Sequence, residues 1–365
     1  MNVISGNIQK CPFSNTVPAG VKGQPKYLSE KPMFGSTKLG PASSAYLFAL
    51  DERKGTGKGY DVLYFDGNNN GDLTDDKPVY KHTGRYGQES FGPVKVLIDY
   101  GQGPSLYYGS ADCYPDRSEL YFSSAGYFTG KAKFGNKQHA IAVIDYNNNG
   151  TFDNRTGDFW SRDRILVDIN DDGNFSEEYN DLSERCIYAK YFKVGEEYYA
   201  AETSPDGAKV VITQPEISFG AVRFTPEMFQ GAVMSDETGL FTVSADSGKV
   251  NLPQGQYRVV YNSIKKTDKS GPGWILEHRE YSGKPLFEVK SGEVTEFKYG
   301  EPLTAKLTYT KEGSDIQFAI AFTDIAGMGY TIGRGQNSFE QPSPPKINIF
   351  DSSGNLIASK IFEYG

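Results

Sequence analysis

The chain has 365 residues, of which 46 are acidic and 38 basic, and its formal net charge is −8. This acidic balance argues against a nucleic-acid partner, because phosphate recognition requires a basic surface. The length allows two or three domains, and no apolar run approaches the roughly 18 residues of a transmembrane helix, so no membrane span is predicted.

The N-terminal segment, residues 1–40, is rich in Pro, Gly, Ser and Lys and has few apolar runs. It is predicted to be an extended arm rather than part of a core. From residue 41 onward, short apolar or alternating stretches recur between turn residues, and the 41 Gly and 19 Pro fit many turns and few helices. These features predict an all-β chain, with a first β domain over residues 41–213.

Three short apolar strands, at residues 62–65, 141–144 and 165–167, each run into an Asp-x-Asn-x-(Asn/Asp)-Gly turn. Oxygen-bearing residues at alternate positions, with Gly at position 6 for the bend, form the front half of an EF-hand-type calcium loop. A hard cation takes about six to eight oxygen ligands, and this spacing turns the odd positions inward. The pattern predicts Ca²⁺ binding. Positions 1, 3, 5 and 7 are Asp66, Asn68, Asn70 and Asp72 in loop 1; Asp145, Asn147, Asn149 and Thr151 in loop 2; and Asp168, Asn170, Asp172 and Asn174 in loop 3.

All three loops depart from the EF-hand at position 12, where the bidentate Glu is replaced by Lys77, Thr156 and Tyr179. We expect loop 3 to bind best and loop 2 to be short of nearby carboxylates. The alternative is that Asp, Asn and Gly simply close tight turns through their own hydrogen bonds. The nearby acids that can substitute for the missing Glu are Asp75 and Asp76 in loop 1, Asp153 and Asp158 in loop 2, and Glu177 and Glu178 in loop 3.

Because strands rather than helices flank the loops, they resemble the strand-flanked Asp-x-Asp-x-Asp-Gly calcium loops of dockerin-like and thrombospondin type 3-like repeats. The resemblance covers residues 60–80 and 141–180. It implies the calcium-ligand positions and no particular protein partner. An apolar residue two positions after each loop glycine is expected to anchor the loop exit in the core; these residues are Leu73, Phe152 and Phe175.

A different pattern begins near residue 214. The stretch Gly-x-x-x-Leu-Pro-x-Gly-x-Tyr at residues 248–257 resembles the carboxypeptidase-regulatory and Ig-like or prealbumin-like β-sandwich modules. This resemblance implies a sandwich module over residues 214–300, with residues 301–365 either a second module or the completion of the first. The whole arrangement resembles secreted bacterial β proteins that join calcium loops to sandwich modules.

No catalytic constellation is recognisable in the sequence. The three histidines, His82, His139 and His278, have no partner at metal-ligand spacing, and no nucleophile elbow or phosphate loop is present. The chain is therefore predicted not to be an enzyme.

The predicted calcium loops also bear on location. Loops with few carboxylates belong to the weak class of extracellular calcium modules, with dissociation constants of about 10⁻⁴–10⁻³ M, so an extracellular or cell-surface location is expected. No signal peptide is visible at the start, which indicates an intracellular chain or a mature or truncated one. The three cysteines leave two alternatives open, a Cys113–Cys186 bridge or buried free thiols, with Cys11 unpaired.

The leading hypothesis is a non-catalytic, calcium-stabilised structural or adhesive protein that self-assembles into a filament or surface layer. In that hypothesis the N-terminal arm adds a strand to the sheet of a neighbouring copy. One alternative is a glycan-binding module that uses outward rings among the 25 Tyr, or Trp160 and Trp274, as stacking surfaces. Another is a carboxylate-dependent glycan hydrolase with two acids about 5–10 Å apart.

Overall fold

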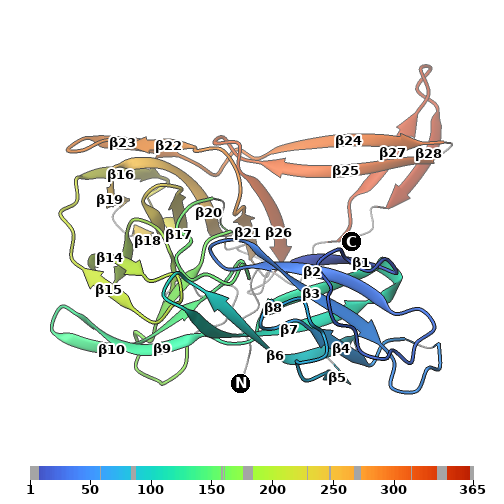
Figure 1. Cartoon of the computed structure of the whole chain (residues 1–365). Helices are drawn as coiled ribbons and strands as arrows, with labels where there is room; N and C mark the ends of the chain where they lie inside the picture. Colours follow the sequence, from blue (N-terminus) through green and yellow to red (C-terminus); the bar gives the residue numbers. More distant parts are fainter. Residues whose placement is uncertain are drawn as a thin grey trace. The chain divides into compact units, whose positions relative to one another are not determined.

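The computed structural model describes residues 8–57, 59–83, 88–157, 159, 161–175, 184–227, 229–245, 248–266, 273–313, 315–334 and 343–361. These residues form strands and turns with one short 3-10 helix, η1 (Pro115–Arg117), which confirms the all-β prediction. In the part of the chain so described, no helix is long and apolar enough to cross a membrane. The chain divides into two units (Figure 1). Unit 1 comprises Met1–Glu216 with Asp236–Gly239, and unit 2 comprises Ile217–Ser235 and Leu240–Gly365.

Unit 1 begins with a closed barrel in which each strand is antiparallel to the next and the eighth pairs back with the first. The large inward-facing rings of Phe48, Phe91 and Phe122 are 1%, 0% and 0% exposed, so side chains fill the barrel interior. The strands are β1 (Gln9–Ser14), β2 (Met33–Leu39), β3 (Ser44–Asp51), β4 (Val62–Phe65), β5 (Val79–Thr83), β6 (Glu89–Asp99), β7 (Pro104–Tyr114) and β8 (Glu119–Ser124).

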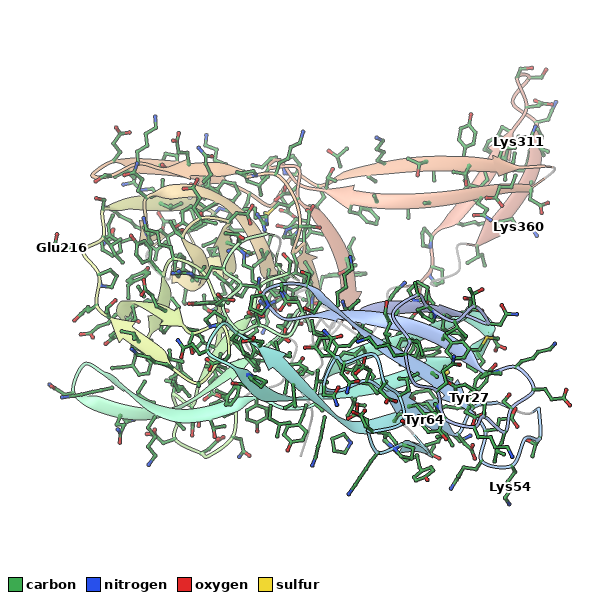
Figure 2. The ribbon with its side chains drawn as sticks, viewed as in Figure 1. Tyr27, Lys54, Tyr64, Glu216, Lys311 and Lys360 are labelled. Carbon is green, nitrogen blue, oxygen red and sulfur yellow. The ribbon has the colours of Figure 1, made fainter. Side chains whose placement is uncertain are left out.

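The predicted extended arm over residues 1–40 is wrong for the part that the structure describes. Strand β1 pairs with β2 on one edge and with β8 on the other, and Cys11 and Phe13 point into the barrel core. Between β1 and β2, Tyr27 packs edge-on against Tyr64 with ring centroids 6.0 Å apart (Figure 2). The two buried side chains of β1 give an alternation too short to recognise beside so many Pro, Gly and Lys residues. Both edges of β1 are paired within the barrel, so β1 itself has no free edge for strand addition.

The structure shows the oxidation state of two of the three cysteines. Cys11 and Cys113 are buried, free thiols in the barrel core, so the Cys113–Cys186 bridge is contradicted and the free-thiol alternative holds for this pair. The side chain of Cys186 lies outside the described residues.

The rest of unit 1 consists of two small antiparallel sheets, one of four strands in the order β12-β11-β10-β9 and one of three in the order β13-β14-β15. Ile165 and Val167 share a buried cluster with Phe192 and Tyr199, so the two sheets pack together. The strands are β9 (Phe128–Phe134), β10 (Lys137–Ile144), β11 (Arg164–Val167), β12 (Arg185–Ile187), β13 (Phe192–Val194), β14 (Glu197–Thr203) and β15 (Val210–Thr213).

Unit 2 contains a three-stranded sheet in the order β19-β16-β23 and an eight-stranded sheet in the order β18-β17-β20-β21-β26-β25-β24, with β22 paired to β20. Phe224 of β16 stacks on Phe229 of β17 at 4.1 Å, which joins the two sheets. The strands are β16 (Phe219–Thr225), β17 (Phe229–Ser235), β18 (Gly239–Ala245), β19 (Lys249–Pro253), β20 (Gly255–Lys266), β21 (Trp274–Arg279), β22 (Phe287–Val289), β23 (Val294–Lys298), β24 (Thr304–Glu312), β25 (Asp315–Thr323), β26 (Gly329–Arg334), β27 (Lys346–Phe350) and β28 (Leu356–Ile361).

The C-terminal strands continue this larger sheet, because β26 pairs with β21 along the register Glu277↔Thr331 and β25 and β24 follow it outward. Strands β27 and β28 form a separate two-stranded sheet. Within unit 2, Figure 1 shows β24 and β25 as a long ribbon.

Candidate metal centres

The three loops have the same backbone conformation. In each, the residue at position 4 and the glycine at position 6 have positive φ, a region that Asn, Asp and Gly tolerate. At Gly150 a side chain is also excluded by contact, because a Cβ atom would lie 2.8 Å from the backbone nitrogen of Gly40. The φ angles are 57° and 85° at Asn69 and Gly71, 59° and 79° at Asn148 and Gly150, and 58° and 80° at Asp171 and Gly173.

The three loops also share one hydrogen-bond pattern, in which odd-numbered side chains accept from backbone N–H groups further along. The position-1 carboxylate accepts from positions 5 and 6, the position-3 amide oxygen from position 5, and the position-5 oxygen from position 7. The oxygens at positions 1, 3 and 5 are therefore turned toward the inside of each bend. For position 6 the distances are 2.8 Å to Asp66, 2.7 Å to Asp145 and 3.0 Å to Asp168.

Each loop has a second acid that the six-residue motif does not contain. In every case its carboxylate accepts the N–H of position 2, which places it next to the position-1 aspartate. The three pairs are Gly67 to Asp76 at 2.8 Å, Tyr146 to Asp163 at 3.1 Å and Ile169 to Glu184 at 3.2 Å. The structure thus brings together Asp66 with Asp76, Asp145 with Asp163, and Asp168 with Glu184.

Antiparallel register explains the first two pairs. Strands β4 and β5 pair Leu63 with Val79, and the same register continued by three residues sets Asp66 opposite Asp76. Strands β10 and β11 pair Ile144 with Arg164, so the next positions are Asp145 and Asp163. In loop 3 the second acid is one position out of register, and the longer Glu side chain spans the difference.

The acids of loop 2 are the most deeply buried. Asp145 and Asp163 are 1% and 0% exposed. Burial raises the pKa of Asp145 to about 6, and burial together with the charge of Asp145 raises the pKa of Asp163 to about 8. The hydroxyl group of Tyr107 donates to Asp145 at 2.8 Å. Two buried carboxylates side by side cannot both stay ionised without a cation or a shared proton.

Loop 1 shows the same electrostatics in a more open site. Burial raises the pKa values of Asp66 and Asp76, and the nearby charge of Asp75 raises both further. The side-chain amides of Asn68 and Asn70 donate to Asp75 at 3.1 Å and 2.6 Å, whereas the carboxylate of Asp72 accepts from Thr74 outside this group.

Loop 3 is the most exposed of the three. Asn170, Asp172 and Asn174 are exposed, whereas Asp168 and the second acid Glu184 are buried at 4% and 3% exposed. The Nδ1 atom of His139 lies 2.8 Å from the backbone oxygen of Asp168. Three predicted ligands, Asp158 of loop 2 and Glu177 and Glu178 of loop 3, lie outside the described residues.

No protein-family model, curated protein or solved structure matches this chain. What the loops can bind therefore follows from their donor atoms. These are carboxylate and amide oxygens, the ligands of a hard cation such as Ca²⁺. Within the described ranges no three His, Cys, Asp or Glu side chains converge on one metal position, because each loop combines a pair of buried or half-buried acids with amide oxygens instead.

Sequence reasoning missed three residues of these sites. The expectation that loop 2 lacks further carboxylates is wrong, because Asp163 returns to it from 18 residues away. Glu184 returns to loop 3 in the same way. Asn154 accepts from the amide of Asn149 at 2.9 Å, as Asp75 does in loop 1, whereas the predicted ligand Asp153 is half-buried beside it. Asp75, which was predicted, and Asn154 both stand at position 10 of their loops. The matching position is the signal that could have identified Asn154.

The loop exits are anchored as predicted. Leu73 and Phe152 are 0% and 3% exposed, and the half-buried Phe175 packs on the cluster of Ala142, Ile144 and Leu166. Phe152 belongs to the barrel core.

Loop 2 also joins the barrel to the four-stranded sheet. Its backbone oxygen at Gly150 accepts from the hydroxyl of Tyr100 at 2.7 Å, and the side-chain oxygen of Asn148 accepts from the backbone of Ser124 at 2.6 Å. A cation in loop 2 would therefore stabilise the attachment of one part of unit 1 to the other.

Proposed function

We propose that this chain is a non-catalytic, calcium-stabilised extracellular protein of structural or adhesive type. The observation that carries the proposal is the buried pair Asp145 and Asp163, whose carboxylates interact electrostatically in a loop that also presents the amide oxygens of Asn147 and Asn149. A divalent cation would neutralise both charges where water cannot.

Calcium suits the loops better than other biological cations. Zinc and other transition metals favour His and Cys ligands, whereas the loop donors are oxygens. Magnesium needs near-ideal octahedral geometry and retains water, which a bend closed by its own backbone hydrogen bonds does not favour. A site with two carboxylates falls in the weak class that fills at the millimolar calcium found outside cells, which supports the extracellular assignment.

Calcium binding is tested by dialysis of EDTA-stripped protein against CaCl₂, with bound metal measured by mass spectrometry. We expect Asp66→Asn and Asp145→Asn each to remove about one bound calcium, because each deletes a position-1 carboxylate. Asp116→Asn, in the exposed helix η1, is the matched control and should remove none. Protein that retains no calcium above the buffer at millimolar CaCl₂ contradicts the proposal.

The finer fold of unit 2 is part of the same proposal, namely an Ig-like or prealbumin-like sandwich. Support comes from the Leu-Pro-x-Gly-x-Tyr stretch. Leu252 and Tyr257 are 1% and 0% exposed, and the hydroxyl of Tyr257 donates to the backbone oxygen of Pro253 at 2.8 Å. The motif thus forms a turn that is held by its own hydrogen bond and buried in the core.

Self-assembly has a candidate surface in the ribbon of β24 and β25, which pair over nine positions. Every residue of β24 is exposed. Alternation along the two strands gathers apolar side chains on one face and mostly polar ones on the other. The apolar face consists of Ala305, Leu307, Tyr309, Ile316, Phe318, Ile320 and Phe322, with Lys311 at its end opposite Ile316. Leu307, Tyr309 and Ile316 are 51%, 70% and 51% exposed.

We infer that the apolar faces of two copies pack against each other. Nine residue pairs at strand spacing cover only about 300 Å² per copy, below the roughly 800 Å² of a standard interface. The association is therefore expected to be weak and concentration-dependent. One two-fold contact gives a dimer, and a filament needs a second contact. The exposed Phe350, Ile357 and Ile361 of the β27–β28 hairpin offer one.

Analytical ultracentrifugation over a range of concentrations tests this surface. We expect Leu307→Lys to weaken association at least about tenfold, because it puts a charge on the apolar face. Thr308→Lys, one residue on and on the opposite face, is the matched control and should associate like the unmodified chain. Equal association of all three proteins, or a monomer at every concentration, would rule the ribbon out.

A further inference from the structure

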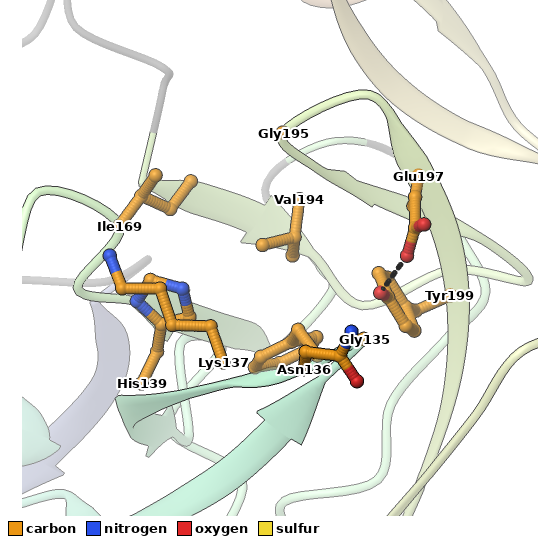
Figure 3. Close-up of a pocket in the computed structure, with 10 residues that line it drawn as sticks. Gly135, Asn136, Lys137, His139, Ile169, Val194, Gly195, Glu197 and Tyr199 are labelled. Carbon is orange, nitrogen blue, oxygen red and sulfur yellow. Dashed lines mark hydrogen bonds between the residues drawn. The ribbon is translucent and has the colours of Figure 1, made fainter.

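A cavity of about 350 Å³ lies within unit 1 between the tips of two hairpins (Figure 3). One tip is the β9–β10 turn with Asn136, and the other is the β13–β14 turn that leads to Glu197. Its floor is the apolar cluster that includes Phe134 and Val194. The volume lies at the lower end of the roughly 300–1,000 Å³ of small-molecule sites, which suits one small ring rather than a long chain.

The polar walls carry charges that already have partners. On one side Lys137 pairs with Asp171 at 2.6 Å, and on the other Glu197 accepts the hydroxyl of Tyr199 at 2.5 Å. Figure 3 shows Lys137 and His139 on one side of the cavity and Glu197 and Tyr199 on the other. Each group keeps hydrogen-bonding capacity, because an ammonium has three N–H donors and a carboxylate about four acceptor sites.

This combination selects a class of ligand. An ionic ligand gains little, because the charge of Lys137 is paired with Asp171 and the charge of Glu197, which is exposed, is screened by water. A purely apolar ligand would strip water from Lys137, Asn136 and Glu197 without replacing its hydrogen bonds. A neutral polyhydroxylated ring meets both requirements, since each hydroxyl group donates and accepts while the C–H face of the ring is apolar.

We propose that this cavity binds a single neutral saccharide unit. The apolar face of the sugar lies on Phe134 and Val194, and its hydroxyl groups bond to Glu197, Asn136 and Lys137. Of the two Trp residues considered from sequence, Trp274 is 37% exposed on β21 of unit 2, and Trp160 lies outside the described residues. The proposal does not rest on calcium.

The site is tested with the full chain and a panel of neutral monosaccharides (glucose, galactose, mannose and N-acetylglucosamine), by ligand-observed NMR and calorimetry, in calcium and in EDTA. We expect at least one sugar to bind saturably with a millimolar dissociation constant. Glu197→Gln should weaken that binding about tenfold, because hydrogen bonds to a charged group are the stronger ones.

Glu202→Gln is the matched control, since it makes the same change on the same strand with the side chain on the opposite face and exposed. It should leave the affinity unchanged. Asn136→Ala, in the facing turn, provides a second variant, and thermal melts verify that all three remain folded. The proposal is overturned if no neutral sugar of the panel binds at tens of millimolar, or if Glu202→Gln weakens binding as much as Glu197→Gln. The cavity borders loop 3 through Ile169 and the Lys137–Asp171 pair, so sugar binding is measured in calcium and in EDTA alongside bound calcium, and either proposal can then fail while the other holds.

Discussion

Calcium is expected to raise the melting temperature of this protein, and Asp163→Asn to remove much of that rise. A ligand that binds only the folded state stabilises it by about 2.7 kcal/mol at one hundred times its dissociation constant. For a unit of this size that corresponds to about 5–10 °C. Asp163 supplies the second carboxylate of loop 2, the most buried of the three sites, so its loss should abolish the contribution of that loop.

The same substitution should behave differently without calcium. Burial and the charge of Asp145 raise the pKa of Asp163 to about 8, so at neutral pH the metal-free carboxyl group is largely protonated. Asn is also neutral, but its NH2 group cannot accept one of the two backbone N–H groups, of Tyr146 and Asn154, that the carboxyl oxygens of Asp163 accept. We therefore expect the melting temperature in EDTA to fall by the effect of one buried hydrogen bond, and the calcium-dependent rise to be lost in addition. Calorimetric scans of both proteins, with and without CaCl₂, give the comparison, and Asp116→Asn is the control. If calcium raises the melting temperature of Asp163→Asn as much as that of the unmodified chain, loop 2 is not a calcium site.

The second large effect is a pH dependence that calcium should reverse. The folded-state pKa values of Asp145 and Asp163 are raised to about 6 and about 8, so the folded chain holds protons that the unfolded chain has released. Stability without metal is therefore fully present below about pH 4 and falls as the pH rises toward about 8. Each tenfold change in proton affinity corresponds to about 1.4 kcal/mol, so the two groups together are expected to lower stability by several kilocalories per mole.

With calcium the pH dependence of stability is reversed. The metal binds the deprotonated carboxylates, so its affinity increases as the pH rises and the carboxyl groups lose their protons. The difference between the melting temperatures in CaCl₂ and in EDTA should widen from about pH 5 to about pH 8, reaching roughly 10 °C. Melts at a series of pH values measure it directly. A metal-free protein whose stability is flat or rising over this window would show that the buried acids are paired in some other way.

Features that depend on residues close together in the sequence were predicted correctly, whereas features that depend on distant residues were not. Within each loop, the ligand positions depend on contacts between residues two to five apart, such as Asp66 with Asn70 and Gly71. Such Asx-type hydrogen bonds need only the local sequence, so three copies of one motif fold into one geometry. The all-β class followed in the same way from turn residues and short apolar stretches.

The second acid of loop 1, Asp76, was predicted because it lies close in sequence, but Asp163 and Glu184 could not be predicted, because strand pairing brings them back from further along the chain. Asp163 is 18 residues from Asp145, and only the pairing of β10 with β11 sets them face to face. Which acid lies opposite a loop depends on the length and path of the chain between two strands, and that is a property of packing.

Local residue patterns were enough to specify three oxygen-lined bends and a chain made of strands. The tertiary structure alone decided that the N-terminal segment closes a barrel through β1 and that Asp163 completes loop 2. The difference arises from the sequence separation between the residues in contact. A turn is specified by the few residues that bond within it, whereas barrel closure and cross-strand pairs depend on which distant strands bury their apolar faces together.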